Sequence, residues 1–282
     1  MTNDFLTLEA AGGIGVLTME RPPGNGITVG FAERMIEMMD RVAGDRGVRC
    51  LVVRSAFSKY FMVGADLKEF PPDLDLSGID YDQPPDKVFA ETFARVTPHW
   101  QNILKAAQSM MNSVAALPKP VVASIGGHAL GGGCEFALAC DFRVMSRGHA
   151  TVGLTETTLG LIPAGGGTQR LPDVVGLARA RELILTGMRL GADEAQAIGL
   201  ITTAVDPERL EEETLALAGT LASGATRALG CAKRLLNRRR DMTLEEGLDL
   251  ERECIDELSG TADMLEGVAS FVQGRKPSYT GA

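Results

Sequence analysis

The sequence has no uninterrupted apolar run near the ~20 residues that a membrane-spanning helix requires. Its N-terminal stretch, MTNDFLTLEA, includes an early acidic residue. It also lacks the basic segment followed by an apolar segment that is typical of a secretory signal peptide. These two absences predict a cytoplasmic protein with no membrane partner.

Paired cysteines are missing as well. The chain has five cysteines, an odd number, and none of them forms a C-x-x-C pair. Its three histidines show no metal-ligand spacing relative to the cysteines. We therefore expect reduced thiols, as in a cytosolic compartment, and no metal site.

Positive charge is scarce in this chain. Lysine and arginine number 28 against 37 aspartate and glutamate residues, which gives a net charge of −9. This balance argues against a nucleic-acid partner or a membrane-surface role. An anionic ligand would need a local cluster of lysine and arginine. What is present, 45% hydrophobic and 23% charged residues, is ordinary for a globular domain.

Strand-like and helix-like segments alternate along most of the chain. Apolar side chains recur at helical spacing in residues 29–43, whereas residues 48–54 have the continuous apolar pattern of a buried strand. The full set comprises strands 5–10, 14–19, 48–54, 121–125, 142–145, 150–153 and 201–205, with helices 29–43, 100–117, 134–140, 173–186 and 193–198. The alternation predicts crossover connections, and therefore an α/β fold with a largely parallel sheet.

Other segments depart from this alternation. Residues 55–64 are predicted to be a loop, and residues 66–70 a short helical piece. Residues 71–98 are rich in proline and aspartate and are predicted to form an irregular surface excursion. From residue 207 to residue 282 the pattern is helical, with a capping box at Thr243. This tail is predicted to be a helical layer for packing or subunit contacts.

The rest of the chain is organised around residues 119–141, KPVVASIGGHALGGGCEFALACD. A buried strand leads into a glycine-rich turn, and Glu135 follows in the first turn of an apolar helix. An ionised glutamate is rarely buried without a partner. Glycines expose backbone N–H groups, and a helix N-terminus adds positive potential. The stretch therefore indicates a catalytic site for a substrate that becomes negatively charged.

Two other interpretations of this stretch remain open. A glycine-rich turn before a helix also binds phosphate groups, although neither a G-x-G-x-x-G nor a P-loop spacing is present. Alternatively, Glu135 caps its own helix in a purely structural turn. A second carboxylate, Glu156, follows a strand among mostly uncharged neighbours. Low polarity raises a carboxyl pKa towards the working pH, so the two glutamates are a candidate acid/base pair. The alternative for Glu156 is an ordinary surface position in a loop.

The two motifs ALGGGCEFALACD and TETTLGLIPAGGGTQRL together resemble the enoyl-CoA hydratase/isomerase (crotonase) superfamily. Further matching segments are Glu20-Arg21-Pro22, residues 61–67, Leu185-Thr186-Gly187, residues 197–200 and the C-terminal Arg275-Lys276-Pro277. The resemblance implies a ClpP/crotonase-like α/β spiral of ββα units. It divides the chain into a core at residues 1–206 and a C-terminal helical region at 207–282 that builds homotrimers or dimers of trimers.

The resemblance also implies an activity, the syn addition of water to a trans-2-enoyl-CoA through an enolate-like state. The backbone N–H groups of Ala65 and Gly132 would stabilise the charged thioester oxygen. Glu135 would deprotonate the attacking water, and Glu156 would protonate Cα. Coenzyme A enters as part of the acyl-CoA thioester substrate, so no separate cofactor is expected. Its adenosine and phosphate groups are assigned to Val63, Asp66, Leu67, Lys68 and Arg21.

Some positions depart from the hydratase pattern, and other activities stay open. Ala164 stands where hydratases commonly have glycine, and Thr155 stands where they frequently have proline. Gly274 stands where some hydratases have a lysine that contacts coenzyme A, a role for which Lys276 could substitute. A Δ3-Δ2-enoyl-CoA isomerase needs a single base, for which Glu156 suffices. Two further alternatives remain. One is another acyl-CoA reaction of the superfamily, and the other is a non-catalytic homologue that binds acyl-CoA or RNA. The presence of both glutamates favours the hydratase.

Overall fold

Two sheets form the centre of the fold in the computed structural model, which describes residues 5–66 and 88–282. The larger sheet has the strand order β1-β2-β3-β5-β7-β9, and the smaller has the order β4-β6-β8. Their bounds are β1 (Leu6–Ala11), β2 (Ile14–Met19), β3 (Cys50–Ser55), β4 (Tyr60–Met62), β5 (Val121–Ile125), β6 (His128–Leu130), β7 (Phe142–Ser146), β8 (Val152–Gly153) and β9 (Thr203–Val205). β1 and β2 pair antiparallel, as the predicted hairpin requires, and the other pairs among these nine strands of the described residues are parallel.

The chain winds through both sheets in repeated ββα turns. β3 and β4 precede α2 (Val88–Ala116), β5 and β6 precede α3 (Gly132–Ala139), and β7 and β8 precede α4 (Gly167–Thr186). In each turn the first strand enters the large sheet and the second enters the small one. This winding has the form of the expected spiral, and it places the ends of β4, β6 and β8 side by side.

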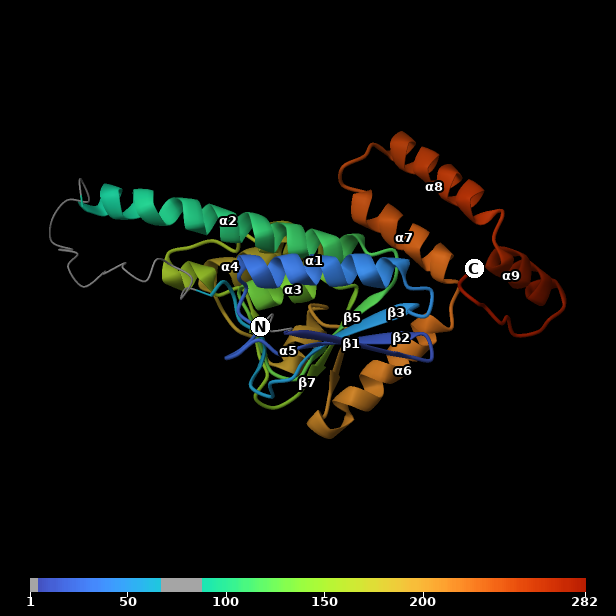
Figure 1. Ribbon diagram of the computed structural model, residues 1–282, viewed down its shortest axis with the longest axis horizontal. Coiled ribbons are helices and arrows are strands. Elements are labelled where there is room, and N and C mark those ends of the chain that lie inside the picture. The colour runs from blue at the N-terminus through green and yellow to red at the C-terminus, as the bar shows by residue number, and fades with distance from the viewer. Residues whose placement is uncertain (1–4, 67–87) are drawn as a thin grey trace.

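Helices cover both faces of the large sheet (Figure 1). α1 (Val29–Gly44) packs on α2, and α2 and α4 both pack on α3, so these helices form one layer. On the opposite face lies α6 (Leu210–Ala222), which contacts β3, β5 and β7. Alternate strand residues face the two sides, as the two-residue period of a strand dictates. Val52 and Val122 pack towards α6, whereas Leu51 and Val121 belong to the core under the helical layer.

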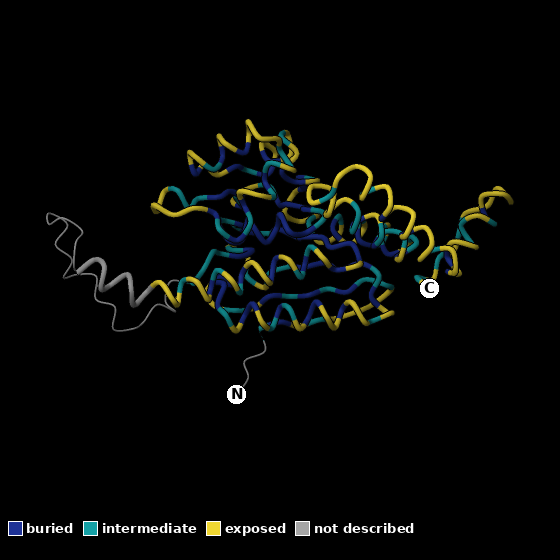
Figure 2. The backbone as a smooth tube through the Cα atoms, turned by 90° about the horizontal axis from the view of Figure 1, so that it is seen from above, coloured by how far each residue is buried: buried dark blue, intermediate teal, exposed yellow. Residues whose placement is uncertain are grey.

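The C-terminal helices extend away from the sheets (Figure 1). They are α7 (Thr226–Arg238), α8 (Leu244–Leu258) and α9 (Ala262–Val272). Figure 2 shows buried residues concentrated in the centre of the molecule and many exposed residues along this extension. The predicted capping box is confirmed, because the Thr243 hydroxyl accepts the Glu246 amide and the Glu246 carboxylate accepts the Thr243 amide at 2.7 Å.

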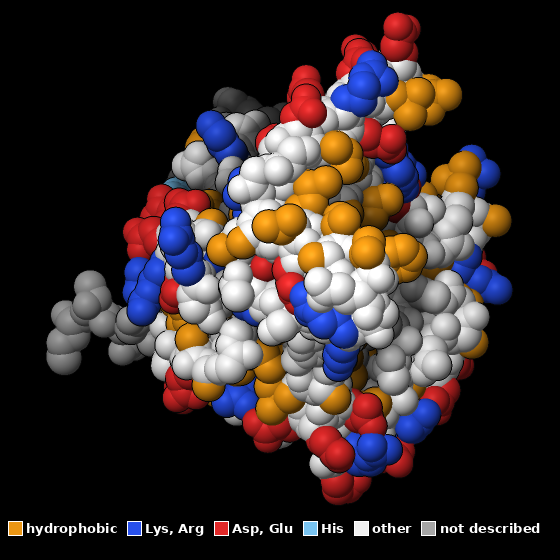
Figure 3. Space-filling model, turned by 90° about the vertical axis from the view of Figure 1, so that its right-hand side faces the viewer, with side chains coloured by type: hydrophobic (Ala, Val, Ile, Leu, Met, Phe, Trp, Pro, Cys, Tyr) orange, Lys and Arg blue, Asp and Glu red, His pale blue; other side chains and the backbone are white. Residues whose placement is uncertain are grey.

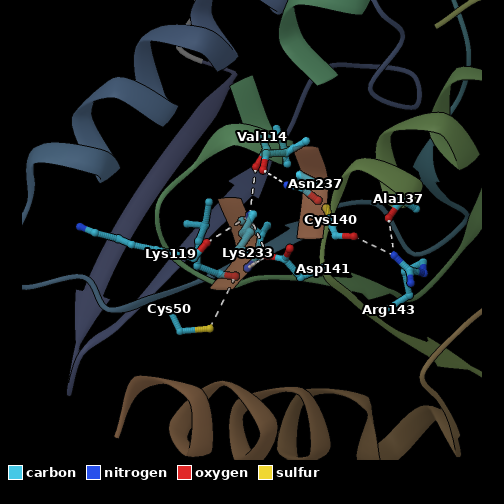
Figure 4. Close-up of polar contacts among 12 residues, drawn as sticks. Cys50, Val114, Lys119, Ala137, Cys140, Asp141, Arg143, Lys233 and Asn237 are labelled. Carbon is cyan, nitrogen blue, oxygen red and sulfur yellow. Dashed lines mark hydrogen bonds and ion pairs between the residues drawn. The ribbon is translucent and has the colours of Figure 1, made fainter. Parts of the chain in front are cut away.

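Two basic side chains join the extension to the core. In Figure 4, Lys233 of α7 lies between Lys119 and Asp141. Its Nζ donates to the Asp141 carboxylate at 2.7 Å and to the Lys119 carbonyl at 3.2 Å. Arg49, which directly precedes β3, donates to the carbonyls of Gly224 and Tyr279. Residues distant in sequence thereby hold α7 and the chain terminus against the sheet.

The structure corrects several sequence-based boundaries. β4 lies within the predicted loop 55–64 and β6 within the predicted glycine-rich turn, because strands of three residues are too short to show a two-residue period. Helix α2 begins at Val88 and contains Pro98, so the predicted irregular excursion is wrong for residues 88–98. The rest of that excursion, and residues 67–70 of the predicted helical piece, lie outside the described residues.

α4 begins at Gly167 rather than near residue 173, and it consists of two helical segments joined at a kink at Gly176. In the described ranges, no helix is both long enough and apolar enough to cross a membrane. The α/β architecture with parallel pairing beyond the first hairpin agrees with the sequence analysis.

Candidate active site

Glu135 is buried at the start of α3, with 4% of its surface exposed. The helix begins where β6 ends, after Gly131 turns the backbone with a φ of +55°. A Cβ at Gly133 would lie only 1.9 Å from the carbonyl oxygen of Met62, which ends β4. Glycine is therefore required for α3 to approach the small sheet, and this approach fixes the Glu135 side chain inside the protein.

The Glu135 carboxylate is held by a second glycine run. Its Oε1 accepts the amide of Gly167 at 2.8 Å, and a Cβ at Gly165 would lie 2.5 Å from its Oε2. Burial raises the pKa of Glu135, while the amides of Gly167, Gly165 and Gly166 and the charge of Arg170 oppose that rise. The carboxylate is therefore stabilised from another segment of the chain. It does not cap its own helix, so that interpretation of Glu135 is wrong.

Glu156 lies across from Glu135 in a different environment. It begins a short 3₁₀ helix, Glu156–Leu159, where the sequence predicts a loop. A Cβ at Gly131 would lie 3.1 Å from the Glu156 Oε1, which places this carboxyl beside the turn that starts α3. Its Oε2 is buried and has no hydrogen-bond partner within the described residues. Burial, followed by the negative charge of Glu135, raises the pKa of Glu156 to about 7.

Burial raises the pKa of both carboxyls, but the groups that oppose this rise differ between them. Backbone amides and a nearby guanidinium favour the ionised form of Glu135. Burial and the charge of Glu135 bring the pKa of Glu156 to about 7 and outweigh the amides of Glu156 and Thr155, which lower it, while the buried Oε2 of Glu156 has no hydrogen-bond partner in the described residues. Two neighbouring carboxyls in such different surroundings can act as a base and an acid.

Two backbone N–H groups on touching segments of the chain are available near the start of α3. Gly64 and Asp66 both bond to Ile27 across a parallel bridge, so the intervening Ala65 amide points away from Ile27. The Gly132 amide lies in the first turn of α3, where helix amides lack an intrahelical acceptor. Neither amide bonds to an acceptor in the part of the chain that the structure describes. A Cβ at Gly132 would lie 3.1 Å from the Gly64 Cα, so the two segments touch.

The residues assigned to coenzyme A are placed only in part. Leu67 and Lys68 lie outside the described residues. Arg21 Nη1 forms an ion pair with Asp66 at 2.9 Å and donates to the carbonyl of Gly26. The structure therefore brings two of the assigned residues together, but their charges offset each other. Val63 directly follows β4, and its amide donates to the carbonyl of Gly24.

Residues 163–167, which supply the amides around Glu135, were not among the predicted site residues. The signal was present, because three successive glycines follow Ala164 in the second motif. Arg170, whose Nη1 donates to the Gly165 carbonyl at 3.1 Å, was not among the predicted site residues either. Nothing local to the Glu135 sequence points to a partner about thirty positions further along the chain, so only the fold could reveal this contact.

Comparisons with known proteins complete this description. The model of the family described as "Enoyl-CoA hydratase/isomerase" matches residues 87–282. The human "Enoyl-CoA hydratase domain-containing protein 2, mitochondrial" is 35% identical over 95% of this chain and 86% of its own length. The mouse "Methylglutaconyl-CoA hydratase, mitochondrial" is 34% identical over 95% of this chain and 80% of its own. A crystal structure of an enoyl-CoA hydratase from Bacillus anthracis is 32% identical, covers 99% of this chain and all of its own, and superimposes with a TM-score of 0.83, which confirms the expected fold.

Proposed function

The chain belongs to the enoyl-CoA hydratase/isomerase family of enzymes, and on that premise we propose that it adds water to the double bond of a trans-2-enoyl-CoA. The observation that carries this proposal is the contrast between the two glutamates. Hydration requires both a base for water and an acid for carbon. In this proposal Glu135, whose carboxylate accepts the Gly167 amide, is the base, and Glu156, with a pKa of about 7, is the acid.

In this proposal the thioester oxygen binds to the Ala65 and Gly132 amides. Negative charge grows on that oxygen as water attacks Cβ, and preorganised amides stabilise it without reorganising. The start of α3 adds favourable potential from its helix dipole. Two observations support this role. Neither amide donates to an acceptor within the described residues, and the segments that carry the two amides are in contact.

The proton transfers then divide between the two glutamates. Glu135 takes a proton from the water as the new C–O bond forms at Cβ. Glu156 gives its proton to Cα as the enolate collapses, which yields a 3-hydroxyacyl-CoA. The pair is ready again once Glu135 has released a proton and Glu156 has regained one. For the coenzyme A part of the substrate, we keep the assignment of Val63, Leu67 and Lys68, with Arg21 and Asp66 as a neighbouring ion pair.

The test is a spectrophotometric assay of the purified protein with crotonyl-CoA. We expect the absorbance of the conjugated enoyl thioester to fall as water adds to it. A matched sample receives a 3-enoyl-CoA, in which an isomerase would instead make that absorbance appear. If the absorbance appears with the 3-enoyl-CoA and does not fall with crotonyl-CoA, the protein is an isomerase and the hydratase proposal is wrong.

We further propose that the C-terminal helices assemble the protein into trimers or dimers of trimers. Figure 3, which faces the extension, shows hydrophobic side chains gathered on this side of the molecule. Apolar side chains of α8 and α9 that are exposed include Leu244, Ile255, Leu265, Val268, Phe271 and Val272. Such exposed apolar area is typical of a surface that binds another protein.

Sedimentation velocity measures this assembly directly. The unmodified chain is expected to sediment as three or six copies, and Phe271→Glu, which places a charge on a side chain that is 88% exposed, is expected to weaken the assembly. A substitution at exposed Glu33 of α1, Glu33→Gln, is the matched control. A protein that sediments as one copy at micromolar concentration would contradict the proposal.

A further inference from the structure

The loop of residues 163–167, which we call the glycine loop, is held from both sides. Its amides face Glu135, with the Gly167 amide at 2.8 Å from Oε1. Its carbonyls face away and bind side chains of two helices. Gln108 of α2 donates to the Ala164 carbonyl at 2.7 Å, and Arg170 of α4 donates to the Gly165 carbonyl at 3.1 Å.

Peptide planarity links these two sets of contacts. The Ala164 carbonyl and the Gly165 amide belong to one peptide unit, and the Gly165 carbonyl and the Gly166 amide belong to the next. The N–H and C=O of a trans peptide point in opposite directions. A donor that fixes the carbonyl therefore also fixes where the amide points. Both amides are among those that stabilise the Glu135 carboxylate.

The glycine loop needs such an external restraint. Gly166 has a φ of +116°, and a Cβ at Gly165 would lie 2.5 Å from the Glu135 Oε2. Glycine is therefore required for the close approach, but it leaves the backbone with more conformational freedom than any other residue. Without partners for its carbonyls, the loop could turn its amides away from the carboxylate.

Arg170 is itself held in place. Its Nη2 donates to the Asn112 side-chain oxygen at 2.6 Å, while its Nη1 binds the glycine loop. Asn112 and Gln108 lie one helical turn apart on α2, so the same face of that helix reaches the loop directly and through Arg170. The Arg170 charge also acts on Glu135, although no hydrogen bond joins the two side chains.

We propose that Arg170, held by Asn112 and assisted by Gln108, is a positioning residue that orients the glycine-loop amides towards the Glu135 carboxylate. This inference rests on the proposed role of Glu135 as the base. Arg170 contacts the glycine loop, so in this proposal it acts through the geometry and charge state of Glu135. Misplacement of a reacting group by about 1 Å can cost on the order of 10²-fold in rate.

The experiment compares Arg170→Met, Arg170→Lys and Asn112→Ala with Arg179→Met. Arg179 lies in the same helix and forms an ion pair with exposed Glu182, away from the glycine loop contacts, so it is a matched control. For Arg170→Met we expect kcat for crotonyl-CoA hydration to fall ~10–100-fold with little change in KM. Arg170→Lys retains the charge and should recover part of the rate. Asn112→Ala should show a smaller loss, because Arg170 keeps its loop contact.

The pH profile separates positioning from a merely structural role. Arg170→Met removes a positive charge and loosens the loop amides, both of which lower the pKa of Glu135 in the unmodified protein. The pKa of Glu135 should therefore rise. Because Glu135 must be ionised to act, the acid limb of the kcat/KM profile should move to higher pH. Arg170→Lys should move it less. A variant that is only partly folded would lose rate at every pH without moving the limb. An unchanged limb, or an unchanged kcat, in Arg170→Met would overturn the proposal.

A second readout does not depend on activity. The Glu135 side-chain carboxyl can be titrated by ¹³C NMR and assigned by its absence in Glu135→Gln. Its titration should shift to higher pH in Arg170→Met and stay unchanged in Arg179→Met. If the unmodified protein hydrates no enoyl-CoA, the proposed function fails, while this titration still supports or overturns the action of Arg170 on Glu135.

Discussion

Glu135→Gln and Glu156→Gln are each expected to lower kcat for crotonyl-CoA hydration by ~10²–10⁴-fold, the usual contribution of a positioned acid or base. Glutamine preserves the size of the side chain but can neither accept the proton of the attacking water nor supply a proton to Cα. At position 135, the Gly167 amide still finds a carbonyl oxygen, so the glycine loop should be disturbed little. The loss therefore reports the chemistry and not the fold.

The double variant should be only slightly slower than the slower single variant, because residues that act as a unit are strongly non-additive. The unmodified enzyme should also lose kcat/KM as the pH rises above about 7, where Glu156 gives up its proton. Glu33→Gln on exposed α1 is the matched control and should retain full activity. If both single variants hydrate crotonyl-CoA at near-normal rates, the assignment of these glutamates is wrong.

Gly133→Ala is expected to cause the largest loss of stability. The added Cβ would lie 1.9 Å from the Met62 carbonyl oxygen and 2.7 Å from its carbon, so backbone rather than a flexible side chain must move. We expect the free energy of unfolding to fall by more than the ~1–3 kcal/mol of ordinary overpacking. Urea-induced unfolding, followed by circular dichroism, measures the change.

Gly219→Ala supplies the comparison within the same chain. Gly219 lies inside α6, and a Cβ there would meet nothing within 4 Å. Alanine should therefore raise the free energy of unfolding by roughly 0.5–1 kcal/mol, because it restricts the unfolded chain and suits a helix better than glycine. Equal stability of Gly133→Ala and the unmodified protein would show that α3 does not need to contact β4 as closely as the structure indicates.

The sequence predicted those parts of the fold that depend on local patterns. The hairpin, α1, β5 and the start of α3 all follow from apolar periodicity and glycine placement, and Glu135 stood out because a carboxylate followed three glycines in an apolar segment. β4 and β6 could not be predicted in the same way. They become strands by pairing with each other, and β4 is separated from β6 by more than sixty residues of chain.

Two features of the structure could not be predicted from the local sequence. The proline and aspartate content of residues 71–98 suggested an irregular segment, yet residues 88–98 belong to α2, which contains Pro98. The Arg21–Asp66 pair was hidden for a different reason. Each residue was assigned separately to coenzyme A, and sequence alone gives no way to learn that their charges meet.

The ββα winding also has a consequence for how the protein is made. Each turn gives one strand to each sheet before the next turn begins, and Ala65, Gly132, Glu135, Glu156 and Arg170 follow one another in that order. A chain emerging from the ribosome therefore receives the groups of the site in the order in which the spiral lays down its layers. All five residues have been synthesised by the time α4 is complete. The helices that follow α4 in the chain therefore contribute none of these five residues.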